Sequence, residues 1–228
     1  MSAGLVCCAQ HEEVTAAAAT SAMNVFRMEG SYTAARAEAM RQRCDTGRCD
    51  TASTMSARRH PNVVNVSEVE SMTRTAGTRF GAVRKNLGAV SGGSALGCTW
   101  HEVEPGRAAY PRHFHTANEE AVYVLEGTGT ALIGEAAVAI GPGDFIGLPV
   151  GPEHVHQIKN TGTAPLRYLA FSTMHDVEIV GYPDSKKIGA MAAPSLRAAF
   201  TGGPKPWVAH IGREADAVGY FEGEDTGE

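Results

Sequence analysis

Short runs of alternating polar and apolar residues dominate the chain from residue 62 onward, and they limit its possible folds more than any other feature. Examples are EEAVYVLEG, TGTALIG, DFIGLPV and RYLAFST, and glycine, proline, asparagine or aspartate punctuate the sequence between such runs. A period of two places successive side chains on opposite faces of a strand, and the punctuating residues are typical of turns. We therefore predict an all-β fold, either a sandwich or a small barrel.

Changes in composition divide the chain into three parts. Residues 1–54 are rich in alanine and small polar residues and have no apolar stripe, so we expect a poorly ordered extension. Residues 55–183 contain the strand-like runs and are predicted to form the barrel. Residues 184–228 are expected to form a C-terminal arm, in which GREADAVGYFEGE would add one strand.

Charge and cysteine content narrow the setting in which the protein works. The 228 residues carry a formal net charge of −5 without a run of lysine and arginine, so nucleic acid is not an expected partner. No apolar stretch approaches the roughly 18 residues of a membrane-spanning helix, and no signal-peptide pattern is present. The five cysteines are irregularly spaced, which is typical of reduced thiols. These features predict a cytoplasmic protein that does not associate with membranes.

Two histidines and a glutamate in PRHFHTANEEAVYVLEG are candidate metal ligands. In a strand, His113 and His115 project from the same face because side chains alternate. In the next run, Glu120 shares a face with Val122 and Val124, so it points inward if those valines enter the core. An inward carboxylate beside imidazoles is costly unless a cation pairs with it. Imidazole nitrogens and a carboxylate oxygen suit iron, manganese, zinc or nickel, so we predict a divalent transition-metal site.

A fourth ligand is expected in LPVGPEHVHQIKN, which contains His154 and His156. Both histidines have the same parity as Ile158, so alternation does not choose between them. Either one would complete a set of three imidazoles and one carboxylate. Four protein ligands leave coordination positions open for a small molecule, as in catalytic rather than structural metal sites.

The spacing of these residues resembles the two sequence motifs of the cupins, which are small double-stranded β-helix (jelly-roll) barrels. The first motif, G-x5-H-x-H-x3/4-E-x6-G, is matched, with one extra residue after the first glycine, by Gly106, His113, His115, Glu120 and Gly127. The second motif, G-x5-P-x-G-x2-H-x3-N, is matched by Gly143, Pro149, Gly151 and Asn160. The resemblance extends over roughly residues 58–228 and is closest to single-domain cupins of uncharacterised function.

The second motif bears on the choice between the two downstream histidines. Counting forward from Gly151 selects His154, whereas counting back from Asn160 selects His156. We favour His156, because a strand absorbs an insertion less easily than the preceding Pro-Gly turn does. His154 remains the alternative: it is either the fourth ligand itself or a residue that supports the ligands.

The resemblance implies a metal-binding cupin and leaves two classes of function open. The first is a metal-dependent enzyme, of the oxygenase or isomerase type, that acts on a small polar metabolite. The second is a module that binds a sugar or another small effector without turnover. Small cupins often dimerise, and the arm after Tyr182 suits an exchange of strands, so we predict a homodimer. In either class an apolar pocket wall is expected from Val122, Val124, Ile146, Leu148 and Ile158.

Overall fold

The computed structural model describes residues 60–195 and 203–227 of the chain. The extension expected at residues 1–54 lies outside the described residues. In the described part nearly all regular structure is β, and all pairs of named strands are antiparallel. The helices of this part are all too short or too polar to cross a membrane. The predicted all-β class is confirmed.

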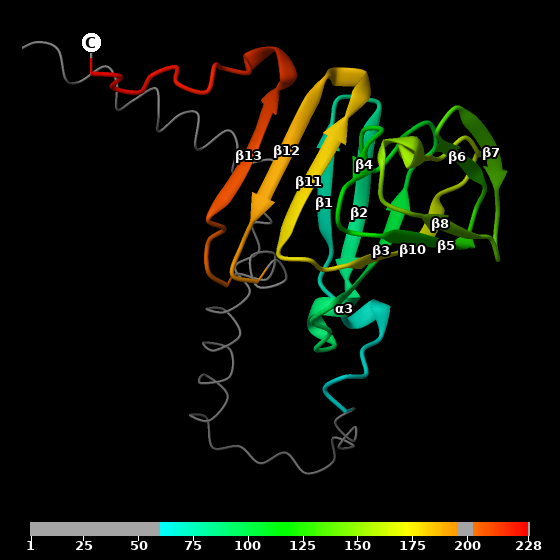
Figure 1. Ribbon diagram of the computed structural model, residues 1–228. Coiled ribbons are helices and arrows are strands. Elements are labelled where there is room, and N and C mark those ends of the chain that lie inside the picture. Colours follow the sequence, from blue (N-terminus) through cyan, green and yellow to red (C-terminus); the bar gives the residue numbers. More distant parts are fainter. Residues whose placement is uncertain (1–59, 196–202, 228) are drawn as a thin grey trace, which may run out of the picture.

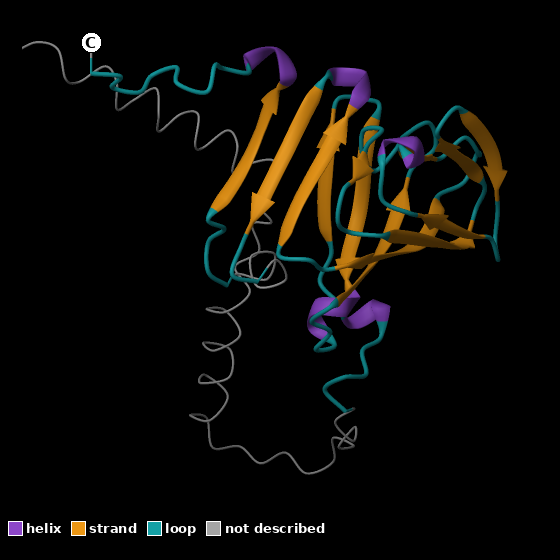
Figure 2. Cartoon of the chain, viewed as in Figure 1, coloured by secondary structure: helices purple, strands orange, loops and turns teal. Residues whose placement is uncertain are grey.

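Strands separated by turns and short helical segments follow one another along the chain, as Figure 2 shows. In chain order the elements are η1 (Val66–Glu68), β1 (Met72–Ala76), β2 (Phe80–Asn86), α3 (Leu87–Val90), β3 (Leu96–Val103), β4 (Phe114–His115), β5 (Glu120–Glu126), β6 (Gly129–Ile133), β7 (Ala136–Ile140), β8 (Phe145–Leu148), η2 (Pro152–His154), β9 (His156–Lys159), β10 (Leu166–Thr173), β11 (Val177–Tyr182), η3 (Pro183–Ser185), β12 (Lys187–Ala192), β13 (Val208–Arg213) and η4 (Glu214–Asp216).

The strands form three sheets in which neighbours are often distant in sequence. The largest sheet has the order β1-β2-β3-β10-β5-β8, so β10 lies between β3 and β5. A second sheet has the order β13-β12-β11-β4, and a third has the order β7-β6-β9. Figure 1 shows β11, β12 and β13 side by side at one end of the molecule and β6 and β7 at the other. Such long crossovers are typical of a jelly roll rather than of a simple meander.

The run TGTALIGEAAVAI forms a hairpin with a two-residue loop, and the loop lies at Gly134, as the sequence predicts. Ile133 of β6 lies opposite Ala136 of β7, so Gly134 and Glu135 form the connection. Gly134 adopts a φ of 55°, a conformation that glycine reaches without steric cost. The GPGD turn before β8 likewise contains a glycine with positive φ, Gly143 at 95°. These turns set the register of the strands that follow them.

The core is built from the inward faces of alternating strands. In β5, Val122 and Val124 are buried while Tyr123 between them is exposed. The expected inward face of this strand is therefore correct, and it is also the face of Glu120. Burying an aliphatic side chain contributes about 1.5–3 kcal/mol. The residues that pack together in the core are Ala82, Val103, Val122, Val124, Ala131, Ile140, Ile146, Leu148, Ile158, Leu166 and Tyr168.

The segment expected to be a C-terminal arm contains two strands. β12 pairs with β11 along its whole length, and β13 pairs with β12, so both extend the four-stranded sheet. The stretch GREADAVGYFEGE contributes only Gly212 and Arg213 to β13 and continues as η4 and loop. The added strand thus lies earlier than expected, because Ala209 and Ile211 supply the alternating partly buried positions that the later stretch lacks.

Candidate metal centre

His113 and His156 face each other across an antiparallel bridge, although they lie far apart in the sequence. The His113 amide donates a hydrogen bond to the His156 carbonyl oxygen at 3.0 Å, and the His156 amide donates to the His113 carbonyl oxygen at 2.7 Å. Directly opposed residues carry their side chains to the same face of a sheet. The two imidazoles therefore lie together, with ring centroids 4.6 Å apart.

His115 joins them through the pairing of β4 with β11. Its partner in this pairing is Val180, and the partner of Phe114 is Gly181. A Cβ atom added to Gly181 would collide with the Phe114 ring. The glycine thus lets β4 lie close to β11 with the Phe114 ring over the backbone. Alternation along the strand then turns His115 to the side of His113.

Glu120 enters the same space from the start of β5. It pairs with Leu148 of β8 and with Ser172 of β10. Its side chain is 26% exposed, and Val122 on the same face is buried. Glu119 is exposed on the opposite face. The structure therefore turns the second of the two adjacent glutamates toward the histidines.

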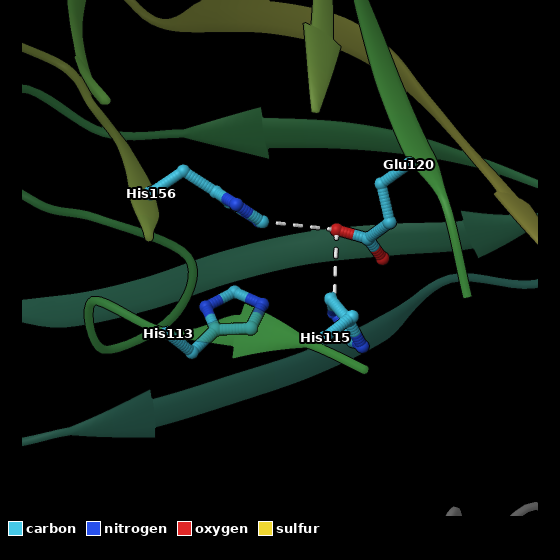
Figure 3. Close-up of side chains that lie close together, drawn as sticks. All are labelled: His113, His115, Glu120 and His156. Carbon is cyan, nitrogen blue, oxygen red and sulfur yellow. Dashed lines mark hydrogen bonds and ion pairs between the residues drawn. The ribbon is translucent and has the colours of Figure 1, made fainter. Parts of the chain in front are cut away.

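The side chains of His113, His115, Glu120 and His156 converge, as Figure 3 shows. Each offers one ligand atom, and these atoms all lie within 4.8 Å of one another. The Glu120 Oε2 atom lies 3.3 Å from His156 Nε2 and 3.5 Å from His115 Nε2. The structure thus brings together the four residues that the sequence suggests as ligands, and we call them the His/Glu cluster.

His154 lies outside the His/Glu cluster, at the end of η2. Its side chain is 36% exposed, and its Nε2 atom lies 3.8 Å from Glu153 Oε1. The turn Pro152–His154 takes up the length by which this segment exceeds the usual motif, and β9 begins at His156. Of the two histidines left open by alternation, His156 therefore joins the cluster.

Main-chain carbonyl groups orient two of the rings. His113 Nδ1 lies 2.8 Å from the Pro111 carbonyl oxygen, and His156 Nδ1 lies 2.9 Å from the His154 carbonyl oxygen. An Nδ1–H group that donates to such a carbonyl leaves Nε2 with its lone pair, which is the atom that binds a metal. His154 thus supports the cluster through its main chain rather than its imidazole.

Glu178 is a buried carboxylate that the sequence reasoning missed. Its Oε2 atom lies 3.4 Å from His115 Nδ1, on the side of the ring away from Glu120. A carboxylate in this position fixes the orientation of a metal-binding histidine and raises its basicity. The signal was present in DVEIVGY, where alternation places Glu178 on the same buried face as Val180.

The loop before β5 holds Glu178 in place. Its carboxylate accepts hydrogen bonds from the backbone amides of Thr116 at 3.1 Å, Ala117 at 3.2 Å and Asn118 at 2.8 Å. The Asn118 side-chain amide also donates to it. This loop joins His115 to Glu120, so Glu178 positions both the ring and the segment between two members of the cluster.

Burial and neighbouring charges act in opposite directions on the cluster. Burial lowers the pKa of His115, but the carboxylates of Glu120 and Glu178 outweigh it and raise the pKa to about 10. Burial lowers the pKa of His113 to about 4, although Glu120 opposes this change. Burial raises the pKa of Glu120, but His115 and His156 bring it well below its usual range. The electrostatic field of the site therefore favours a cation among these residues.

The donor set fits a divalent transition metal. Both ring nitrogens of His115 are buried and make no hydrogen bond of good geometry within the described residues, although a carboxylate lies close to each. Ligands about 2.1 Å from a common ion lie roughly 3–4 Å apart, so small side-chain rotations would bring the cluster to coordinating distances. Three imidazole nitrogens and one carboxylate oxygen are compatible with iron, manganese, zinc or nickel.

The His/Glu cluster lines a cavity of about 770 Å³. Of the expected wall residues, Val122, Leu148 and Ile158 line this cavity. Val124 and Ile146 belong to the same hydrophobic core but do not line the cavity. Alternation identifies the face of a strand but not how deep each residue lies, which is why the expected wall was too large.

Comparison with known proteins adds a family to this geometry. Residues 99–172 match the model of the cupin domain family. The chain is also similar to an uncharacterized protein from Methanocaldococcus jannaschii, with 37% identity over 60 residues. That match covers 26% of this chain and 46% of the other protein, so it spans about half of the length of this relative.

Solved structures resemble a larger part of the chain. A proposed sugar phosphate isomerase from Acidithiobacillus ferrooxidans is 26% identical, with a TM-score of 0.57, over 70% of this chain and 96% of that chain. A cupin-superfamily sugar phosphate isomerase from Silicibacter pomeroyi has the same TM-score of 0.57 at 22% identity, over 68% of this chain and 94% of that chain. Together with the antiparallel jelly-roll strands, the family match over residues 99–172 and these likenesses support a cupin-type domain in this chain.

Proposed function

We propose that this cupin is a metal-dependent enzyme of the isomerase type that acts on a small polar metabolite. The observation that carries the proposal is the convergence of His113, His115, Glu120 and His156 at the wall of a cavity. A cluster that lines a cavity can present an ion to a bound molecule. The likeness to the proposed isomerase from Acidithiobacillus ferrooxidans favours isomerisation over oxygenation.

A bound divalent ion would supply a Lewis acid that polarises a carbonyl or hydroxyl oxygen of the substrate. The chain supplies the surroundings. The Tyr110 and Tyr182 rings each lie 6.1 Å from the His113 ring. Burial raises the pKa of both phenols, so they stay protonated at neutral pH and can donate hydrogen bonds. The apolar wall limits the access of water to the reacting atoms.

Solvent exchange into candidate substrates tests the proposed activity. The protein is loaded separately with manganese, iron, zinc or nickel and incubated with small hydroxy-aldehydes and hydroxy-ketones in deuterated water. We expect metal-dependent deuterium incorporation next to the carbonyl carbon, because isomerisation moves a proton there. His113→Ala and Glu120→Ala should lose the metal and the exchange while the barrel stays folded, as judged by circular dichroism.

The same experiment separates the other classes. Oxygen consumption by the iron-loaded protein, without exchange, would assign an oxygenase in place of an isomerase. Ligands that raise the melting temperature and are recovered unchanged would assign a binding module without turnover. A protein that contains no stoichiometric metal and gains none on reconstitution would refute the proposal.

We further propose that the protein is a homodimer. The face of the four-stranded sheet opposite Glu178 and Val180 carries Val177, Ile179, Ile188 and Val208, which are 43–60% exposed. The register places these residues on three adjacent strands, and β13 is the edge of that sheet. An exposed apolar patch and an open edge both favour association. A monomeric mass by light scattering at micromolar concentration would contradict this proposal.

A further inference from the structure

Basic side chains line the cavity that contains the His/Glu cluster. Besides histidines, the charged lining residues in the described part of the chain include two carboxylates, Glu120 in the cluster and Glu178 beside it. The other charged lining residues are all basic: Arg74 from β1, Arg84 from β2 and Lys187 from β12. The cavity thus combines a candidate metal centre with cations from two different sheets.

Arg84 is separated from the cluster by one side chain. Its Nη1 atom donates a hydrogen bond to Tyr110 Oη at 2.6 Å, and its guanidinium carbon lies 5.8 Å from the Tyr110 ring centroid. The Tyr110 ring centroid lies 6.1 Å from that of His113. The guanidinium carbon therefore lies no more than about 12 Å from the ring centroid of His113, a candidate metal ligand.

Lys187 has the same relation to the cluster through a different tyrosine. Its Nζ atom lies 5.2 Å from the Tyr182 ring centroid, which lies 6.1 Å from the His113 ring centroid. Because β12 belongs to the four-stranded sheet and β2 to the six-stranded sheet, the two cations come from separate parts of the fold. Each of the two tyrosines beside His113 thus contacts one basic side chain.

Arg74 adds a third positive charge at the same place. It lies opposite Ala82 in the β1–β2 pair, and Arg84 is two residues from Ala82, so both arginines project from one face of this hairpin. Burial raises the pKa of Tyr110 and of Tyr182, and Arg74 opposes that rise in both phenols. The positive charge of Arg74 therefore acts on both phenol groups.

We propose that the substrate carries an anionic group, a phosphate or a carboxylate, which Arg84 and Lys187 bind while the metal centre engages its carbonyl or hydroxyl oxygens. This inference rests on the proposed function and specifies the substrate class of that site. A guanidinium group binds phosphate or carboxylate through two parallel hydrogen bonds, and an ammonium group adds a point charge. In a cavity with apolar walls these charges are screened less than on the surface, so they discriminate between anionic and neutral molecules.

Calorimetric titration of the full chain with matched probes tests the inference. The pairs are glucose 6-phosphate with glucose, glycerol 3-phosphate with glycerol, and gluconate with glucose. We expect an anionic probe to bind at least about tenfold more tightly than its neutral partner. The phosphate and carboxylate arms show which anion is preferred.

Variants assign the binding to the two cations. Arg84→Met and Lys187→Met should each weaken binding of the anionic probe by about tenfold or more and reduce its dependence on salt. Lys159→Met is the matched control, because it removes one positive charge at an exposed position outside the cavity, and it should change affinity by less than about twofold. If Arg84→Met does not fold, Arg84→Lys keeps the charge but not the paired hydrogen bonds and should still weaken binding.

Metal content, measured on the same samples, separates this inference from the proposed function. The anion arm is also titrated with metal-free protein, since the cations belong to the chain. Anion selectivity in a protein that gains no metal on reconstitution would refute the proposed function and support the anion site. Three results would overturn the anion site, even if metal is bound. They are equal affinity for anionic and neutral probes, no binding of any anionic probe, and full affinity for the anionic probe in both folded variants.

Discussion

His113 and His156 exchange both of their backbone hydrogen bonds, at 3.0 and 2.7 Å, across an isolated antiparallel bridge. One histidine comes from each of the two cupin-like motifs of the sequence. The main chain therefore holds the two halves of the candidate metal centre in register without help from an ion. The site is preorganised, because the scaffold rather than the metal places its ligands.

Removing an imidazole should accordingly leave the metal-free barrel folded. We expect His113→Ala to lower the free energy of unfolding of the metal-free protein by only about 1–2 kcal/mol, because the backbone bridge remains. Leu148→Ala, at a core position 2% exposed, should cost about 2–5 kcal/mol. Urea unfolding in the presence of a chelator measures both. Loss of cooperative unfolding in His113→Ala would show that the imidazole itself holds the fold.

Glu178 should control metal affinity through His115. Glu178→Gln removes the negative charge 3.4 Å from His115 Nδ1, so we expect metal affinity to fall about 10–100-fold. It should also cost about 1–3 kcal/mol of stability, because the new amide faces backbone donors. Competition with a chromophoric chelator measures the affinity. Glu153→Gln, at a carboxylate 68% exposed, should leave it unchanged, and equal affinity in both variants would exclude this positioning role.

Gly181 should be required for the approach of β4 to β11. In Gly181→Ala the new methyl group collides with the Phe114 ring, so we expect a loss of about 1–3 kcal/mol together with weaker metal binding. Gly147→Ala in β8 is the control, because a Cβ atom there meets no atom within 4 Å. Thermal unfolding and metal titration of the two variants test the difference. Similar behaviour of both would mean that Phe114 yields without disturbing His115.

His101 should make the protein sensitive to acid. Burial, helped by Arg84, lowers its pKa to about 3 from the usual 6.5, and Glu120 opposes the change only in part. The unfolded chain therefore binds this proton at a higher pH than the folded protein does. The contribution of His101 to stability is fully present above pH 6.5 and is lost as the pH falls toward 3, by up to about 1.4 kcal/mol per pH unit.

The variant His101→Gln isolates this contribution. Between pH 7 and about pH 5, its free energy of unfolding should fall by about 1–2 kcal/mol less than that of the unchanged protein. His113 has a lowered pKa in both proteins, so its effect cancels in the difference. Urea unfolding with a chelator present provides the measurement. Parallel pH profiles would refute the assignment to His101.

Local alternation made part of this structure predictable. The inward turn of Glu120 follows from the buried faces of Val122 and Val124, because a period of two is a property of each strand alone. The hairpin at Gly134 is predictable for the same reason, since its signal lies within a few residues. Parity could not choose between His154 and His156, because the two residues are two positions apart. Only the structure shows that His154 ends the turn η2 and that His156 begins strand β9.

The features that could not be predicted from the sequence depend on contacts between distant segments. Glu178 reaches His115 only because β11 lies beside β4, and Arg84 and Lys187 line one cavity only because separate sheets meet around it. Which core residues also line the cavity, as Val122 does and Val124 does not, likewise depends on how the sheets pack. No local pattern contains such information.

Elemental analysis of protein purified without added metal tests the central claim most directly. The unchanged protein and His154→Ala should each carry close to one equivalent of a divalent transition metal, whereas His156→Ala should carry almost none. This result is expected because His156 lies in the cluster and His154 contributes only its carbonyl group. Absence of metal from the unchanged protein even after reconstitution, or loss of metal in His154→Ala but not in His156→Ala, would contradict the account.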